Sequence, residues 1–264
     1  HLGRTVLSTA NGADTPTALL ARETMRRWRL MQLHAPALGQ PDDFGAPDTL
    51  GRDGAHLAAT IYRLCQGRPG AQILKRVGAR LASVYPEVRE LRLVVDDARR
   101  QIRLEVIDGQ RTSYPIGSLG DGCLGLLGLA TLAEDPMSAH LLCLDGPERG
   151  LHPAGVPPLL DLLQGMVSDV RAGVSSTNPL RQVIVSSHAP AVVAQLPGEC
   201  LLVAQLRGGA TRLVPLVDTW RSAADAMAPT VSSSELYGYF GPISPAAERV
   251  PSKQSRQTLR EDAT

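Results

Sequence analysis

The stretch of sequence that decides the fold is LLCLDGPERGLHP, residues 141–153. It begins within a short, nearly all-apolar run, His140 to Leu144, that ends directly before Asp145. Such a run is typical of a strand in a parallel sheet, because helices cover both faces of these sheets. An aspartate at the end of the strand then lies at the carboxyl edge of the sheet, where α/β proteins bind ligands and Mg²⁺. The alternative is an ordinary turn, since Asp-Gly-Pro is common turn chemistry.

Helix and strand patterns alternate around this stretch, which predicts a parallel α/β core. Upstream, a glycine-rich loop leads into an apolar helix. Downstream, an amphipathic helix, a buried strand and a short helix precede two strands that are expected to complete the sheet. These segments are, in order, residues 124–132, 153–170, 183–186, 190–196, 201–204 and 213–217.

The first part of the chain has a different pattern. Pro16 to Met31 is expected to be a helix with Thr15 as its N-cap, residues 56–82 have helical spacing, and the two runs 91–95 and 102–107 predict a hairpin. Three regions follow from these patterns: a helical and hairpin region, an α/β lobe, and a tail that is partly disordered beyond Pro245. Their expected bounds are 1–112, 113–221 and 222–264.

Composition excludes several classes of protein. The chain has 27 basic and 26 acidic side chains, a net charge of +1 and only 3% aromatic residues, so neither a global field for nucleic acid nor a base-stacking platform is expected. No apolar run reaches the roughly 18 residues that span a bilayer, so no membrane is expected as a partner. The only lysines, Lys75 and Lys253, do not follow a glycine. The chain therefore has no Gly-Lys-Ser/Thr phosphate-binding loop, or P-loop.

The four cysteines show neither a Cys-x-x-Cys pair nor a small-domain disulfide pattern. Cys123 and Cys143 fall within apolar runs, where a free cysteine behaves as a small buried hydrophobic residue. We therefore expect a reducing, cytoplasmic compartment. Because the chain begins with His1, it is expected to be part of a longer product.

Two further segments in the α/β lobe carry chemistry. Gly120-Asp121-Gly122 opens a helix, where backbone N–H groups favour an anion; the alternative is a loop that merely caps the helix. Residues 183–190, VIVSSHAP, deliver His188 to the end of a strand. A histidine there is able to donate to a phosphate oxygen at near-neutral pH, and its alternative is a structural role.

In order and spacing, the three motifs resemble the C-terminal half of ABC-type ATPase heads, and most of all the AAA-type predicted ATPases related to SMC, RecF and OLD proteins. Residues 120–124, GDGCL, look like the signature loop of that family. Residues 141–153 look like its Walker B strand and D-loop, and residues 186–190, SSHAP, look like its switch loop. The resemblance implies a P-loop NTPase-like, ABC-type head with a partial parallel sheet and flanking helices.

The resemblance also implies roles for individual residues. In such heads two protomers hold ATP between them, which implies a homodimer or a pair with another ATPase head. Gly120, Asp121 and Gly122 would contact the partner's nucleotide, Asp145 would hold Mg²⁺, and His188 would contact the γ-phosphate. His152, in the D-loop, would pack across the dimer interface. ATP and Mg²⁺ are therefore the expected cofactors.

This chain departs from the family pattern at three positions. Gly146 stands where the family has the glutamate that orients the attacking water, Gly125 stands for an arginine, and Arg149 stands for an asparagine. Loss of a positioned general base costs about 10²–10⁴ in rate. Glu148 matches the second glutamate of the motif, and would replace the first only through a loop shift. The hypothesis is an ATP-binding head whose hydrolysis is impaired.

Two other functions stay open at this point. A degenerate homologue without catalysis would serve as a binding or scaffolding module. A metal-dependent hydrolase would use Asp145, Glu148, His152 and His188. Glu148 and His152 are four residues apart, a spacing that places two metal ligands on one face of a helix. The turn at Gly150 opposes a regular helix there.

DNA is a possible partner by analogy with the family only. The residues that would support it are four arginines expected on one helix, most of them on one face, where they would meet phosphates: Arg22, Arg26, Arg27 and Arg29. The alternative is a solvated helix face.

Overall fold

The computed structural model describes residues 5–66, 70–175, 178–224 and 229–238. The chain divides into two compact units, His1–Gln195 and Leu196–Thr264. This division follows compactness alone and tests neither predicted boundary, at 112 or at 221. Within the described residues, no helix has the length and apolar character needed to cross a membrane.

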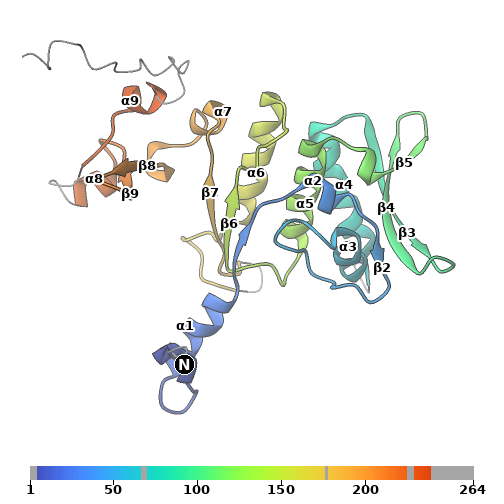
Figure 1. The fold of residues 1–264 in the computed structure, drawn as a ribbon, viewed down its shortest axis with the longest axis horizontal. Helices are drawn as coiled ribbons and strands as arrows, with labels where there is room; N and C mark the ends of the chain where they lie inside the picture. The colour runs from blue at the N-terminus through green and yellow to red at the C-terminus, as the bar shows by residue number, and fades with distance from the viewer. Residues whose placement is uncertain (1–4, 67–69, 176–177, 225–228, 239–264) are drawn as a thin grey trace, which may run out of the picture. The chain divides into compact units, whose positions relative to one another are not determined.

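The first unit contains the predicted parallel sheet (Figure 1). Its strand order is β1-β6-β7, with both neighbouring pairs parallel. The strands are β1 (Trp28–Met31), β6 (Leu141–Asp145) and β7 (Gln182–Ser186). The register pairs Asp145 with Ser186, so two polar residues meet at the carboxyl edge of the sheet. The fold is α/β, with a partial parallel sheet and flanking helices.

The helix predicted to reach Met31 is wrong after Arg26. Helix α1 (Pro16–Arg26) ends at Arg26, and Trp28 to Met31 form the strand β1. The chain after Arg26 extends because it pairs with β6, which satisfies its backbone groups, and because Met31, 1% exposed, enters the core. Tertiary pairing here overrides a local helical pattern.

Only one face of the parallel sheet is well covered in the described chain. Leu142 and Leu144 are buried on that face, whereas Leu30 and Ile184 are 66% and 57% exposed on the other. The predictions of a buried strand over 183–186 and of cover on both faces are therefore wrong. The apolar run of β6 correctly predicted a strand. It carried no information about β7, which has no further strand beside it among the described residues.

Helix α5 (Asp121–Glu134) lies at the centre of the core. No charged residue occurs between its two ends, and a helix that is apolar all round is expected to be buried. Around it pack α2 (Ala35–Leu38), α3 (Leu57–Cys65), α4 (Gly70–Val84) and α6 (Val156–Met166). The short η3 (Pro153–Gly155) precedes α6, which ends at Met166 rather than at the predicted residue 170.

The predicted hairpin is confirmed and belongs to an antiparallel sheet. Strands β3 (Val88–Asp96) and β4 (Gln101–Asp108) pair along their length, and β2 (Asp42–Asp43) and β5 (Ser113–Pro115) pair with β4. The remaining elements of the first unit are η1 (Val6–Thr9), η2 (Ile116–Ser118) and α7 (Pro190–Val193). The last of these lies within the helix predicted over 190–196.

The second unit contains a separate hairpin rather than the end of the parallel sheet. Strands β8 (Leu202–Arg207) and β9 (Ala210–Pro215) pair only with each other in the described chain, around Gly208 and Gly209, whose positive φ angles suit a tight turn. The prediction that these strands complete the parallel sheet is wrong. The unit also has η4 (Gly198–Cys200), α8 (Trp220–Ala224) and α9 (Ser233–Gly238). The predicted disorder beyond Pro245 lies outside the described residues.

Candidate functional site

The candidate site is built around Asp145, the last residue of β6. Ser186 Oγ donates to Asp145 Oδ1 at 2.6 Å, and Gln32 Nε2 donates to Asp145 Oδ2 at 3.1 Å. The three residues come from the carboxyl ends of adjacent parallel strands, as expected for a binding edge in an α/β sheet. Gln32 was missed because the residues directly before it, up to Met31, were assigned to a helix rather than to a strand. The signal that could have found it is its position, because Gln32 is a polar residue directly after the apolar-rich strand β1.

Arg149 is the charged neighbour of Asp145. Its Nη2 donates to Asp145 Oδ2 at 2.9 Å. The hydrogen bond from Ser186, the charge and hydrogen bond of Arg149, and the charge of His188 together hold the pKa of Asp145 below its usual range. The carboxylate is therefore kept ionised at the edge of the sheet.

Gly146, where the resemblance implies a glutamate, has a left-handed backbone with φ of +56°. Its N–H donates to the carbonyl oxygen of Ser186 at 2.9 Å, which fixes the start of the turn after β6. A Cβ at this position would meet the Arg149 side chain at Nε and Cγ. Arg149 thus lies in the space that a side chain at position 146 would enter.

Glu148 connects the turn after β6 to the loop after β7. Ser187 Oγ donates to Glu148 Oε1 at 2.6 Å and accepts from the Ala189 N–H at 3.0 Å. Glu148 Oε2 is buried without a hydrogen-bond partner among the described residues. Glu148 therefore holds two predicted motifs together.

The predicted signature loop packs against the same turn. Gly120 is the N-cap of α5, and Gly122 lies so close to Gly150 that a Cβ on Gly122 would overlap the Gly150 backbone. Gly150 itself has φ of +75°. Gly120 and Asp121 are exposed, whereas Gly122 is buried. Two glycines thus bring the start of α5 against the turn beside Asp145.

A cavity of about 410 Å³ lies at this meeting point. Asp121 and Gly125 of α5 line it together with Asp145, Arg149 and two residues of the turn between them, Gly146 and Pro147. The volume falls within the range of small-molecule sites. It combines carboxylates, a guanidinium and a helix start in one place.

The two predicted histidines lie at the surface. His188 is exposed and acts on Asp145 through its charge. His152 is also exposed, and its Nδ1 accepts from the Ala154 N–H at 3.2 Å as the N-cap of η3. In the part of the chain that is described, no three His, Cys, Asp or Glu side chains are grouped to hold a metal ion. The hydrolase that would use Asp145, Glu148, His152 and His188 as a metal cluster is therefore not supported.

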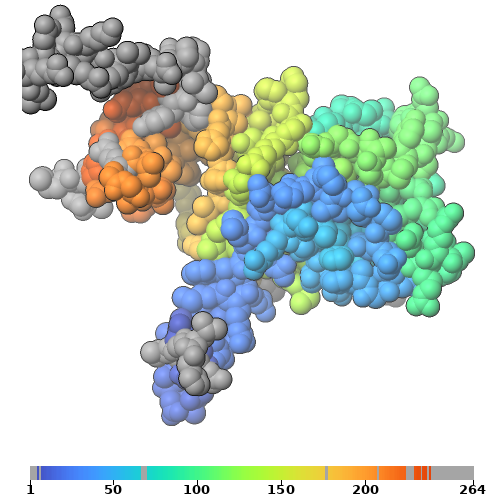
Figure 2. Space-filling view, viewed as in Figure 1, coloured from blue at the N-terminus to red at the C-terminus, as the bar shows by residue number. Residues whose placement is uncertain are grey.

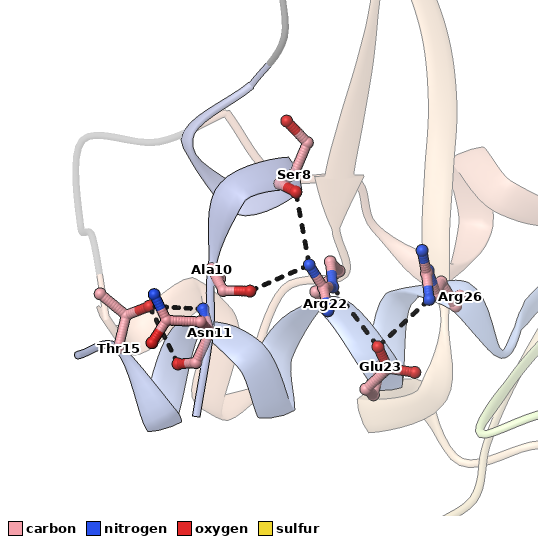
Figure 3. Close-up of polar contacts among 7 residues, drawn as sticks. All are labelled: Ser8, Ala10, Asn11, Thr15, Arg22, Glu23 and Arg26. Atoms are coloured by element: carbon pink, nitrogen blue, oxygen red, sulfur yellow. Dashed lines mark hydrogen bonds and ion pairs between the residues drawn. The ribbon is translucent and has the colours of Figure 1, made fainter. Parts of the chain in front are cut away.

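The four arginines do not form the predicted helix face. Arg22 donates to the carbonyl oxygens of Ala10 and Ser8 at 3.1 and 3.4 Å, and Arg26 pairs with Glu23 at 3.3 Å (Figure 3). Arg27 follows the helix, with Nη1 3.2 Å from His140 Nε2, and Arg29 lies on β1 and donates to the Leu50 carbonyl.

Helix α1 itself has no buried residue, and its blue segment projects from the rest of the first unit in the space-filling view (Figure 2). The local contacts of Arg22 and Arg26 therefore fit the solvated alternative. The expectation of DNA as a partner therefore rests on the family resemblance alone, because the four arginines do not share one helix face.

Residues 68–194 match the sequence model of the family described as "AAA domain, putative AbiEii toxin, Type IV TA system". This segment contains the three stretches that resemble the signature, Walker B and switch-loop motifs, residues 120–124, 141–153 and 186–190. No curated protein has a sequence that matches the chain.

Among solved structures, one chain from a study of ATP-driven dimerisation and DNA-stimulated activation of SMC ATPases is 19% identical. Its TM-score is 0.41, over 55% of this chain and 83% of that one. The Smc head domain with a coiled coil from Pyrococcus yayanosii is also 19% identical, with a TM-score of 0.41 over 56% of this chain and 27% of that one. The SMC head domain from Thermotoga maritima is 15% identical, with a TM-score of 0.37 over 64% and 57%.

The chain thus spans 27% and 57% of the two named head domains. Since these TM-scores lie below 0.5, the architecture rests on the described strands and helices, and the class rests on the sequence match. Residues 68–194 are part of an AAA-type ATPase domain.

Proposed function

We propose that this chain binds ATP as one half of a nucleotide site shared by two ATPase heads, and that it hydrolyses ATP slowly or not at all. The observation that supports this best is the close approach of Gly122 and Gly150, which joins the start of α5 to the turn beside Asp145. The cavity at this junction is lined by Asp121 in the first turn of α5, and the start of a helix favours phosphate.

Each predicted residue has a role in this proposal. Gly120 and Asp121, which are exposed, would face the partner's nucleotide, while the buried Gly122 would position them. His188 would donate to the γ-phosphate from the surface. His152, also exposed, would contact the second head.

The surroundings of Asp145 fit Mg²⁺ in their chemistry. Asp145 offers carboxylate oxygens and Ser186 offers a hydroxyl oxygen, and oxygen is the ligand that Mg²⁺ prefers. A bound Mg²⁺ would offset the negative charge of the phosphates. The protein's part is to keep Asp145 ionised and oriented, which the bond from Ser186 does.

Slow hydrolysis follows from Gly146, since no carboxylate at that position is able to orient water. The test is steady-state ATP hydrolysis by the full-length product, measured for wild type and Gly146→Glu. The glutamate also strains the left-handed backbone and displaces Arg149, so Gly146→Ala, which does both without adding a carboxylate, is the matched control. We expect only Gly146→Glu to raise the rate, and a wild type as fast as Gly146→Glu would contradict the proposal.

A non-catalytic scaffold is the second candidate, and the place of Arg149 on Asp145 favours it. Sedimentation of the full-length product with and without ATP separates the two. A shift from monomer to dimer with ATP supports the nucleotide-dependent head, and a sedimentation coefficient that ATP leaves unchanged supports the scaffold.

A further inference from the structure

We propose that Arg149 is an internal counter-ion of Asp145, which a divalent cation must displace before it binds there. The identity of the site rests on the function proposed above. The family pattern has an asparagine at this position, so the counter-ion is a property of this chain's own sequence.

The geometry makes Arg149 and a cation competitors for one atom. Arg149 Nη2 lies 2.9 Å from Asp145 Oδ2, which also accepts from the neutral amide of Gln32 at 3.1 Å, while Oδ1 accepts from Ser186. A cation that binds Oδ2 would lie next to a positive guanidinium, which is a repulsive arrangement. Arg149 therefore has to leave Oδ2 for the cation to bind.

Gly146 is the second part of the same arrangement. A Cβ at position 146 would meet Arg149 at Nε and Cγ, and would be strained at φ of +56°. The residue that lacks the family's carboxylate therefore also provides the space in which the arginine reaches Asp145. The two departures from the family pattern therefore form one structural feature. Gly146 has no side chain, and the guanidinium of Arg149 occupies the space that a side chain there would enter.

The counter-ion is displaceable rather than permanent. The Arg149 side chain is 59% exposed and that of Asp145 is 39% exposed, so water and salt screen the pair. An exposed pair of this kind resists a competing cation only moderately. We therefore expect weakened cation binding at Asp145 rather than none.

The test is a titration of the full chain with Mn²⁺ in the absence of nucleotide, with free Mn²⁺ measured by electron paramagnetic resonance. Arg149→Gln is expected to bind Mn²⁺ at Asp145 more tightly than wild type, on the order of fivefold. Asp145→Asn is expected to abolish this binding in both backgrounds. Arg99→Gln, which removes another exposed arginine paired with an aspartate, Asp96 at 3.1 Å, is the matched control and is expected to resemble wild type.

Equal Asp145-dependent affinity in wild type and Arg149→Gln would overturn the proposal. The absence of Asp145-dependent binding in both would also overturn it, because removal of the counter-ion would then not open a site. An increase that Arg99→Gln shares would assign the effect to net charge and overturn it as well. None of these readings uses ATP, so failure of the proposed function would not alter them.

Discussion

At the scale of single residues, Asp145 is set apart by how many donors meet its carboxylate. The hydrogen bond from Ser186 is the largest single cause of its low pKa, and the charge and hydrogen bond of Arg149 and the charge of His188 add to it. A carboxyl whose pKa is lower in the folded than in the unfolded chain stabilises the fold above the usual aspartate value of about 3.9. That stabilisation is lost as the pH falls through the folded pKa, so Asp145 contributes to the loss of stability in acid.

Ser186→Ala is therefore expected to raise the pKa of Asp145 towards its usual value. The measurement is a carboxyl ¹³C NMR titration. Ser187→Ala is the matched control, because this neighbouring hydroxyl donates to Glu148 instead. A pKa of Asp145 that moves equally in both variants would show that the direct hydrogen bond is not the cause.

Glu148 presents the opposite case, a carboxylate with a single donor. Since its Oε2 has no partner within the described residues, Ser187→Ala leaves the whole partly buried carboxylate without a hydrogen bond from the chain. We expect this to cost about 1–3 kcal/mol in the free energy of unfolding, measured by urea denaturation.

The double variant Ser187→Ala with Glu148→Ala tests whether that loss comes from the contact. If the serine acts through Glu148, removing it from the Glu148→Ala background costs far less than removing it from wild type. Equal costs in the two backgrounds would contradict the coupling.

At the scale of elements, two of the three glycines in α5 have opposite surroundings. A Cβ on Gly122 would overlap the Gly150 backbone, which has no flexible side chain to move aside, whereas a Cβ on Gly125 would meet nothing within 4 Å. Gly122→Ala is expected to lower the free energy of unfolding by about 2–3 kcal/mol. Gly125→Ala is expected to raise it by about 0.5–1 kcal/mol, because alanine favours a helix interior. Thermal unfolding of the two variants provides the comparison, and similar values would mean that the signature loop does not pack as described.

The elements that the sequence predicts well are those that local pattern determines. The uninterrupted apolar run of α5 and the turn residues between β3 and β4 were sufficient to predict both. Trp28 to Met31 was misread as helix because only its pairing with β6, far away in sequence, makes it a strand. Gln32 was lost with it, since its place beside Asp145 depends on that same pairing.

The candidate site shows the same limit. The order and spacing of the motifs sufficed to predict that Asp145 and the two loops belong together. The contact of Arg149 with Asp145 was not predictable, because it depends on the left-handed backbone of Gly146 and the space beside it. In the sequence, Gly146 and Arg149 are two separate departures from the family pattern, and only the structure shows that they are in contact.

At the scale of the whole molecule, the chain combines an extensive core with a parallel sheet that is open on one side. The core cluster runs from Met31 to Val185 and includes both sheets of the first unit, while Leu30 and Ile184 remain exposed on the parallel sheet. Parallel sheets are normally covered on both faces. The exposed apolar face is therefore consistent with the proposal that this chain is half of a larger nucleotide site.

The last prediction concerns how stability is divided between the two units. Every residue of the large core cluster precedes Gln195, and the β8–β9 hairpin adds none to it. A chain that ends at Gln195 is therefore expected to unfold in one cooperative transition. Its Tm should lie within about 2–4 °C of the first unit's transition in the full chain, the shift that about 1 kcal/mol causes in a domain of this size. Differential scanning calorimetry of the two chains measures this directly. Loss of the cooperative transition on truncation would mean that residues after Gln195 are required for the core to form, and that compactness does not mark the folding unit here.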